Sequence, residues 1–144
     1  MKKYNVMMVD DDTFTNELAT MVINWSDFSA HFCVKENAHE ALQYLNDAYN
    51  HDTYTFPDYI LLDLNMPEMS GFEFIRQFES SFPDKKDKTH FIITTSSILN
   101  KDKKEALSFY SVIDYMVKPI PGDYIEKLIV KGFKHEKQFN NCNN

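Results

Sequence analysis

Cysteine is scarce in this sequence, and no apolar run is long enough to cross a membrane. The 144 residues include two cysteines, Cys33 in an apolar segment and Cys142 in a polar stretch. Two such thiols make neither a disulfide framework nor a zinc knuckle, and they suit a reducing compartment. The opening segment MKKYNVMMVDDD has too few apolar residues for a signal peptide. We therefore expect a cytoplasmic protein with no membrane segment.

Positive charge is also in deficit. The chain has 15 basic and 22 acidic residues, which gives a net charge of −7 at pH 7. A protein that binds nucleic acid gains affinity when its basic groups release counterions from phosphates. We therefore expect no direct nucleic-acid partner. The five histidines lack the spacing of metal ligands, so a zinc site is not expected either.

The sequence has enough apolar material for the core of one domain, because 43% of its residues are hydrophobic and 15% are aromatic. Short apolar runs suited to buried strands alternate with segments of helical periodicity. The runs that predict strands are 4–9, 30–36, 58–63, 90–95 and 112–117. The segments that predict helices are 10–25, 37–50, 70–82, 101–110 and 122–133.

This alternation predicts an open, doubly wound α/β fold. Parallel strands need crossover connections, and strands that are apolar throughout need helices on both faces of the sheet. In the segment 10–25, Phe14, Leu18, Met21 and Trp25 recur at helical spacing, with Val22 beside Met21. In such folds ligands bind beyond the carboxyl ends of the strands, so the residues there are candidates for chemistry.

Polar residues lie at the carboxyl ends of four of the predicted strands. They are Asp10, Asp11 and Asp12 after the first, Asp63 at the end of the third, Thr94 and Thr95 at the end of the fourth, and Lys118 after the fifth. Carboxylates are the oxygen ligands of Mg²⁺, and a cation with hydroxyl donors suits a phosphoryl group. Asp63 could then act as a nucleophile that forms a mixed anhydride with phosphate.

Each of these residues also has a structural explanation when it is taken alone. An acidic triplet before a helix commonly caps that helix, and an aspartate after a strand commonly starts a turn. Threonine favours strands, and a lysine before proline commonly enters a turn. Their placement at one edge of one sheet is what favours a functional site.

Four segments of the chain stand out as motifs, namely MMVDDD, LLDLNMPEMSGFEFI, ITTSS and DYMVKPI. In this order and spacing they resemble the signature segments of the response-regulator receiver domain of two-component signalling. The likeness runs from about Tyr4 to about Phe133. The resemblance implies a flavodoxin-like fold with five parallel strands in the order 2-1-3-4-5 and five helices. It implies a receiver domain over 1–133, followed by a polar C-terminal tail over 134–144.

The resemblance also assigns a role to individual residues around the expected Mg²⁺ site. Asp63 corresponds to the phosphoacceptor, and it would bind the ion directly together with Asp11. The backbone carbonyl of Asn65 would complete the protein ligands, and Asp10 would act through water.

Further residues correspond to the groups that sense the phosphoryl group. Thr95 and Lys118 would contact its oxygens, and Tyr115 would move inward when Thr95 is drawn to the phosphate. The peptide bond between Lys118 and Pro119 would be cis, as in the family. The family often has Gly-Ala before the fifth strand, where this chain has Ser111 and Val112.

The function implied is that of a phosphoacceptor response regulator. A sensor histidine kinase or a histidine phosphotransfer protein would phosphorylate Asp63, and the surface around the fourth helix, fifth strand and fifth helix would switch to bind a protein target. Such a protein catalyses only transfer to its own aspartate and slow hydrolysis. Only 26 residues follow Lys118, so we expect a stand-alone receiver, as a monomer or weak dimer, unless the sequence is a fragment.

Two other classes of protein remain open. One is a receiver-like interaction module that takes no phosphate. The other is a hydrolase of the haloacid-dehalogenase kind, which also forms an aspartyl phosphate. That chemistry needs a second aspartate two positions after the nucleophile, where this chain has Asn65.

Overall fold

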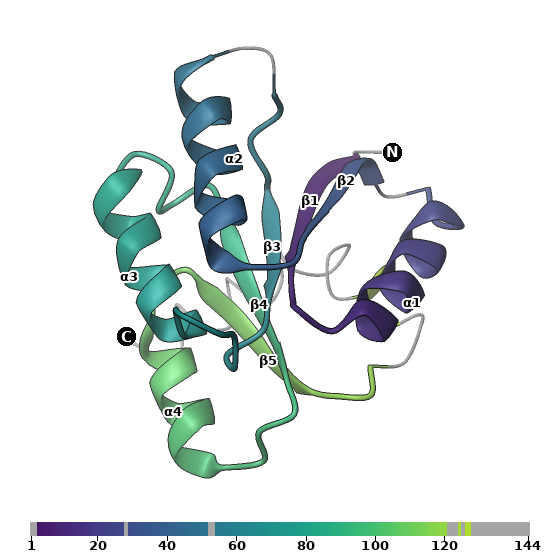
Figure 1. Ribbon diagram of the computed structural model, residues 1–144, viewed down its shortest axis with the longest axis vertical. Helices are drawn as coiled ribbons and strands as arrows, with labels where there is room; N and C mark the ends of the chain where they lie inside the picture. The colour runs from purple at the N-terminus through teal and green to yellow at the C-terminus, as the bar shows by residue number, and fades with distance from the viewer. Residues whose placement is uncertain (1–2, 28, 52–53, 121–123, 125, 128–144) are drawn as a thin grey trace.

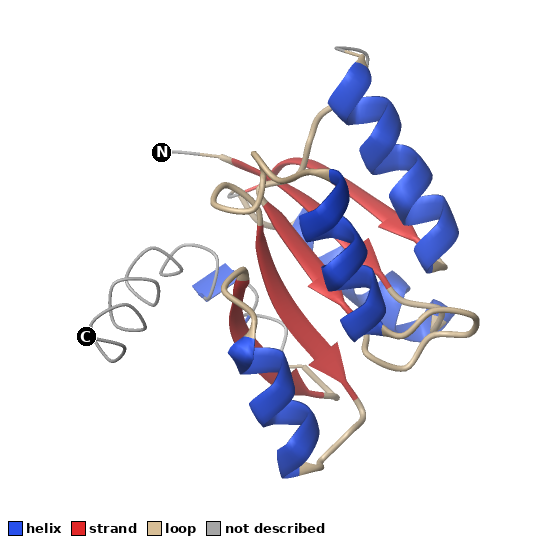
Figure 2. Ribbon diagram, turned by 90° about the vertical axis from the view of Figure 1, so that its left-hand side faces the viewer, coloured by secondary structure: helices blue, strands red, loops and turns tan. Residues whose placement is uncertain are grey.

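The fold is a five-stranded parallel sheet with helices on both faces (Figures 1 and 2). The computed structural model describes residues 3–27, 29–51, 54–120, 124 and 126–127. Its strands are β1 (Tyr4–Val9), β2 (Ser29–Lys35), β3 (Tyr59–Leu62), β4 (His90–Thr95) and β5 (Val112–Val117). They lie in the order β2-β1-β3-β4-β5, so the predicted fold class and strand order are confirmed.

Four helices connect the strands within the described residues. They are α1 (Thr13–Asn24), α2 (Ala38–Asn50), α3 (Gly71–Ser81) and α4 (Asn100–Ser108). Side-chain oxygens of Asp12, Asn37 and Ser70 cap the first three helices by accepting backbone N–H groups of the first turn. The N-cap of α4 is Leu99, which offers no side-chain cap.

The sheet separates two apolar cores, because successive side chains of a strand point to opposite faces. On one face α2, α3 and α4 cover alternate residues of β1, β3, β4 and β5. The fully buried members of this core include Met7, Leu45, Phe74, Phe78 and Phe91. On the other face α1 covers the intervening residues, among them Val6, Met8, Leu61 and Ile92.

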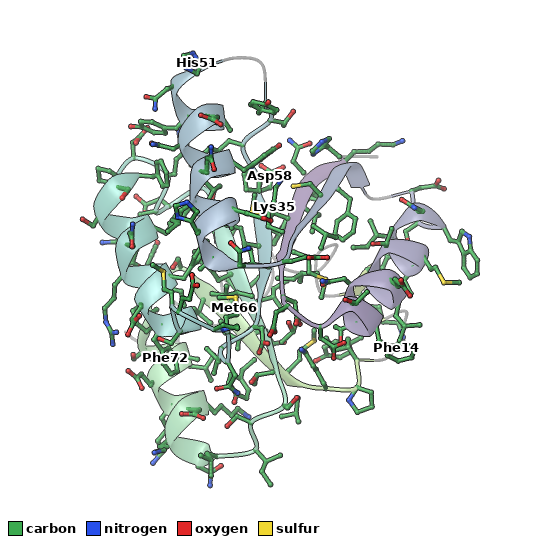
Figure 3. All side chains as sticks on the ribbon, in the orientation of Figure 1. Phe14, Lys35, His51, Asp58, Met66 and Phe72 are labelled. Carbon is green, nitrogen blue, oxygen red and sulfur yellow. The ribbon has the colours of Figure 1, made fainter. Side chains whose placement is uncertain are left out.

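The apolar stripe of α1 faces away from the sheet. It consists of Phe14, Leu18, Met21 and Trp25. Asn16, Ala19 and Ile23 are the buried residues of this helix, and the stripe lies on the opposite side. Phe14 at the start of the helix is 68% exposed (Figure 3), and Trp25 at its end is 80% exposed. The helical spacing thus predicted the element, while the face that meets the core is a different one.

The predicted fifth helix over 122–133 lies largely outside the described residues, although Tyr124, Glu126 and Lys127 are helical. The expected tail over 134–144, which includes Cys142, lies wholly outside them. The division into receiver and tail therefore stays a prediction. Among the described helices, none combines the length and apolar character needed to span a membrane.

Candidate functional site

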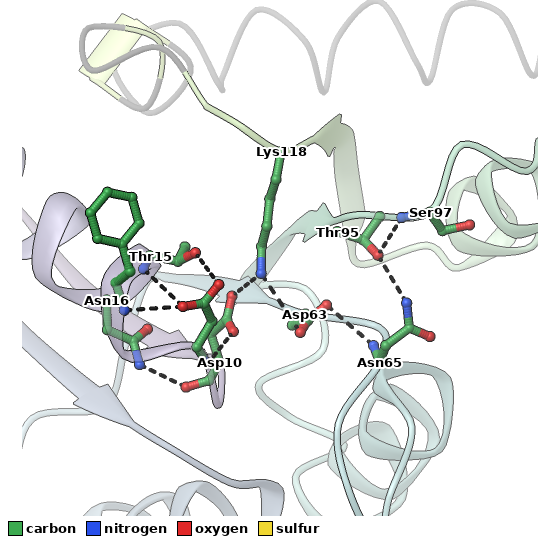
Figure 4. Close-up of polar contacts among 10 residues, drawn as sticks. Asp10, Thr15, Asn16, Asp63, Asn65, Thr95, Ser97 and Lys118 are labelled. Atoms are coloured by element: carbon green, nitrogen blue, oxygen red, sulfur yellow. Dashed lines mark hydrogen bonds and ion pairs between the residues drawn. The ribbon is translucent and has the colours of Figure 1, made fainter.

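The carboxyl ends of four strands bring together Asp10, Asp63, Thr95 and Lys118 (Figure 4). Asp10 and Asp63 directly follow β1 and β3, Thr95 is the last residue of β4, and Lys118 directly follows β5. The first three are buried. β3 is buried along its whole length and β1 over its last four residues, so these strands hold the two carboxylates at fixed positions.

Lys118 lies between the two buried carboxylates. Its Nζ donates a hydrogen bond of 2.5 Å to Oδ2 of Asp10 and lies 3.7 Å from Oδ2 of Asp63. The peptide bond from Lys118 to Pro119 is cis, as the resemblance predicted. One ammonium thus faces two carboxylates, and it lies closer to Asp10 than to Asp63.

Burial and the neighbouring charges together shift the pKa of Asp63 upward. Burial raises the pKa of this carboxyl from 3.8 to about 6, and the negative charge of Asp10 adds to the rise. The ammonium of Lys118 and the backbone N–H of Asn65 act in the opposite direction on this pKa, the latter through a 3.2 Å hydrogen bond to Oδ1. Even at this pKa most Asp63 side chains are ionised at pH 7.

Three carboxylates form a group that could hold a metal ion. Asp10, Asp11 and Asp63 each offer one oxygen, and these oxygens all lie within 4.8 Å of one another. Such a cluster of oxygen donors, one of them exposed, fits Mg²⁺, which binds one or two carboxylates and keeps several waters. The side chain of Asp12 instead caps α1 through the N–H groups of Phe14 and Thr15.

The hydroxyl of Thr95 lies on the far side of Asp63 from α1 (Figure 4). Its Oγ1 accepts hydrogen bonds from the backbone N–H of Ser97 at 3.2 Å and from Nδ2 of Asn65 at 3.5 Å. Thr94, also singled out in the sequence, is buried, and its Oγ1 has no hydrogen-bond partner among the described residues. Of the two threonines, only Thr95 therefore joins the polar network drawn around the carboxylates.

Tyr115 is already packed inward, with 8% of its surface exposed. Its hydroxyl donates a 3.0 Å hydrogen bond to the backbone carbonyl of Ser97. Burial raises the pKa of this phenol, which stays the donor in that bond. The sequence identified Tyr115 through the resemblance, but it gave no sign that the two residues are partners.

Gly71 is a residue whose role at the site becomes visible only in three dimensions. A Cβ at this position would lie 2.7 Å from the backbone oxygen of Asp63 and 2.9 Å from Cα of Leu64. Its N–H donates a 2.9 Å hydrogen bond to the carbonyl of Leu64. The first residue of α3 thus presses directly on the backbone that carries the candidate phosphoacceptor.

The family of proteins that this sequence matches agrees with the geometry of the site. The profile of the response regulator receiver domain covers residues 6–130. The cell cycle response regulator CtrA of Brucella ovis is 30% identical over 118 residues, which are 82% of this chain and 45% of that protein. The chain thus spans less than half the length of the curated relatives it matches.

Solved structures show the same fold. The two-component response regulator from Cytophaga hutchinsonii has a TM-score of 0.82 and 27% identity, over 93% of this chain and 99% of that one. The phosphorylated cyanobacterial phytochrome response regulator RcpA has a TM-score of 0.71 and 23% identity, over 92% and 91%. With its carboxylates, threonine and lysine at one end of this fold, the chain belongs to the response regulator receiver domain family.

Proposed function

We propose that Asp63 accepts a phosphoryl group from the phosphohistidine of a sensor histidine kinase or a histidine phosphotransfer protein. The observation that carries this proposal is the position of the Asp63 carboxylate, which is buried at the end of β3 beside an ammonium and two further carboxylates. The cytoplasmic location expected from the sequence stays a prediction.

The side chains at this site suit transfer to a carboxylate. An Oδ of ionised Asp63 attacks phosphorus, the bond from phosphorus to the imidazole nitrogen breaks, and a mixed anhydride forms. Lys118, whose Nζ lies 3.7 Å from Asp63, and the hydroxyl of Thr95 would meet the phosphoryl oxygens. By resemblance, Asp11, Asp63 and the carbonyl of Asn65 would hold Mg²⁺, with Asp10 acting through water. When bound, Mg²⁺ neutralises charge on the phosphoryl oxygens.

The exposed stripe of α1 is the surface we propose for docking of the phosphodonor. The hollow beside the site, of about 290 Å³, is lined by Phe14 and Leu18 of this stripe and also by Lys118. A protein that brings a phosphohistidine to Asp63 has to cover the hollow and the part of the stripe that lines it. Contact with the stripe would then bury apolar surface that water now covers.

The surface around α4 and β5 is the one we propose for the downstream target. It exposes the large apolar side chains of Ile98, Leu99, Tyr110, Val117 and Tyr124. Protein targets suit such a surface, whereas the net charge of −7 disfavours nucleic acid. Phosphorylation would shift the population of two forms of this surface without remodelling the whole fold.

Intact-mass spectrometry after incubation with acetyl phosphate and Mg²⁺ tests the proposal. We expect a single labile phosphoryl adduct, which is absent without the metal and absent in the variant Asp63→Asn. A folded wild-type protein that gains no adduct would favour the interaction module. Continuous release of phosphate from small substrates would favour the hydrolase.

A further inference from the structure

Ser97 connects the candidate phosphoacceptor site to two other elements. Its N–H donates to Oγ1 of Thr95 at 3.2 Å, and its carbonyl accepts from the Tyr115 hydroxyl at 3.0 Å. Its Oγ donates to Oδ2 of Asp102 at 2.5 Å and accepts from the N–H of Leu99 at 3.3 Å. The three polar atoms of one residue thus join the end of β4, the middle of β5 and the first turn of α4.

The helix that Ser97 reaches is weakly attached to the rest of the molecule. Ala106 is the only buried residue of α4, and the N-cap residue of the helix provides no side-chain cap. Arg76 of α3 forms an ion pair of 3.1 Å with Glu105, but both side chains are about half exposed, and such pairs contribute little. A helix held by so few buried contacts opens or shifts at low free energy.

The bond from Ser97 to Asp102 ties the site directly to this helix. It is a hydroxyl-to-carboxylate hydrogen bond of 2.5 Å, and bonds to a charged acceptor are roughly twice as strong as neutral ones. Asp102 lies in the first turn of α4 and is half-buried. The tie therefore fixes the end of the helix that lies nearest to Thr95.

We propose that Ser97 and Asp102 are positioning residues that transmit occupation of the phosphoacceptor site to α4. This inference rests on the proposed function, in which Thr95 Oγ1 contacts the phosphoryl group. When that hydroxyl moves toward Asp63, the N–H bonded to it moves as well, and Ser97 carries its Oγ and the Asp102 carboxylate along. The first turn of α4 then shifts with the ligand.

The chain allows this connection to be cut selectively. The variant Ser97→Ala removes the Oγ, and with it the bonds to Asp102 and Leu99, but it keeps the backbone N–H and carbonyl that bind Thr95 and Tyr115. Asp102→Ala removes the same tie from the other side. Asp102→Asn keeps an acceptor oxygen and serves as the conservative rescue variant.

Hydrogen–deuterium exchange of the α4 amides, with and without Mg²⁺ and beryllofluoride, measures the transmission. Beryllofluoride takes the place of the phosphoryl group on the aspartate. In the wild type we expect the exchange rates of the α4 amides with and without bound beryllofluoride to differ by about fivefold or more. A factor of about five corresponds to the lower end of known coupling energies between sites. In Ser97→Ala and Asp102→Ala we expect this ratio to fall to about one, and in Asp102→Asn to return.

Beryllofluoride affinity is followed in the same variants and is expected to change less than about threefold, since the side chains around Asp63 remain. The matched control is Ser108→Ala, because the hydroxyl of Ser108 bonds to the carbonyl of Glu105 at the other end of the same helix. This control is expected to keep the wild-type ratio.

Two results would overturn the inference. One is a bound-to-free ratio in α4 that stays at the wild-type value in Ser97→Ala and Asp102→Ala. Faster exchange in both states with an unchanged ratio has the same meaning, because it shows a purely structural role. A wild-type protein that does not bind beryllofluoride is the other, and that result overturns the proposed function as well.

Discussion

At the scale of single residues, the ionised Asp63 lowers the stability of the metal-free protein. Its pKa is raised from 3.8 to about 6, so the folded protein holds its proton more tightly than the unfolded chain does. The contribution of this group to stability is therefore lost as the pH rises from about 4 to about 6, and it stays lost above that range.

We expect the variant Asp63→Asn to be more stable than the wild type at pH 7.5 without metal, by about 1–2 kcal/mol. This is roughly half of the free energy that a pKa shift of this size corresponds to. Urea denaturation in a chelating buffer measures the difference, which should shrink toward pH 4. Asp87→Asn, at an exposed position far from the site in the sequence, is the control. A loss of stability at pH 7.5 in Asp63→Asn would contradict this account.

The same raised pKa sets the pH dependence of metal binding. A proton on Asp63 competes with Mg²⁺ for the carboxylate oxygens, since a metal ligand has to be deprotonated. We expect the apparent affinity for Mg²⁺ to rise about tenfold per pH unit below the Asp63 pKa of about 6 and to level off above pH 7. Calorimetric titration at several pH values measures it. An affinity that is already constant from pH 5 upward would show that Asp63 does not titrate in this range.

At the scale of elements, the junction of β3 and α3 depends on the absence of a side chain at Gly71. A methyl group there would meet the backbone of Asp63 and Leu64 at 2.7 and 2.9 Å, and neither backbone can yield without moving the site. We expect Gly71→Ala to lower the free energy of unfolding by about 1–3 kcal/mol, the usual penalty of overpacking.

Phosphoryl uptake should fall together with stability in Gly71→Ala, because the displaced backbone carries Asp63. Chemical denaturation and the acetyl phosphate assay measure the two effects. Gln77→Ala, at an exposed position of the same helix, should change neither. Full uptake at the wild-type rate in Gly71→Ala would show that the loop adapts without cost to the site.

The two faces of α1 offer a matched pair of substitutions. Leu18 is 47% exposed on the outer stripe, whereas Ile23 is 2% exposed against the sheet. We expect Leu18→Ala to lower the free energy of unfolding by less than about 1 kcal/mol and Ile23→Ala to lower it by about 2–4 kcal/mol. Urea denaturation of both variants decides, and equal losses would mean that the stripe is covered in solution.

The sequence indicated the elements of this fold better than their faces and partners. The alternating periods predicted 4–9, 90–95 and 112–117 at the same bounds as the strands of the structure. Helical spacing could not show which side of α1 meets the sheet, because the buried side contains the polar Asn16. The side-chain amide of Asn16 donates a hydrogen bond of 2.7 Å to the backbone carbonyl of Asp10. This contact forms only when α1 packs against the end of β1.

For the candidate site, too, the sequence indicated which residues take part better than it indicated which residues contact one another. Residue types at strand ends pointed to Asp10, Asp63, Thr95 and Lys118, and the parallel sheet brings them together. Ser111 stands where the family often has glycine. It is buried, and its hydroxyl donates a hydrogen bond of 3.1 Å to the carboxylate of Glu79 in α3. Such long-range pairs depend on tertiary packing, so no local pattern in the sequence reveals them.

At the scale of the whole molecule, two exposed apolar surfaces adjoin the candidate site. One is the α1 stripe, and the other is the set of side chains around α4 and β5 that begins at Ile98 and Leu99. Exposed apolar patches of this kind mark sites of interaction in soluble proteins. A phosphodonor and a target could therefore occupy different surfaces of one small domain.

The single tryptophan makes the α1 surface measurable. Trp25 is the only tryptophan of the chain and is 80% exposed in the folded protein. For the monomer we expect acrylamide to quench its fluorescence almost as strongly in the native state as in urea, and to do so equally at low and high protein concentration. Circular dichroism confirms that the native sample is folded. Native quenching that weakens as protein concentration rises would show instead that a second copy covers the stripe, since burial of Trp25 is the change that excludes the quencher. The proposed docking surface would then be a dimer interface, and the phosphodonor would have to displace the second copy from it.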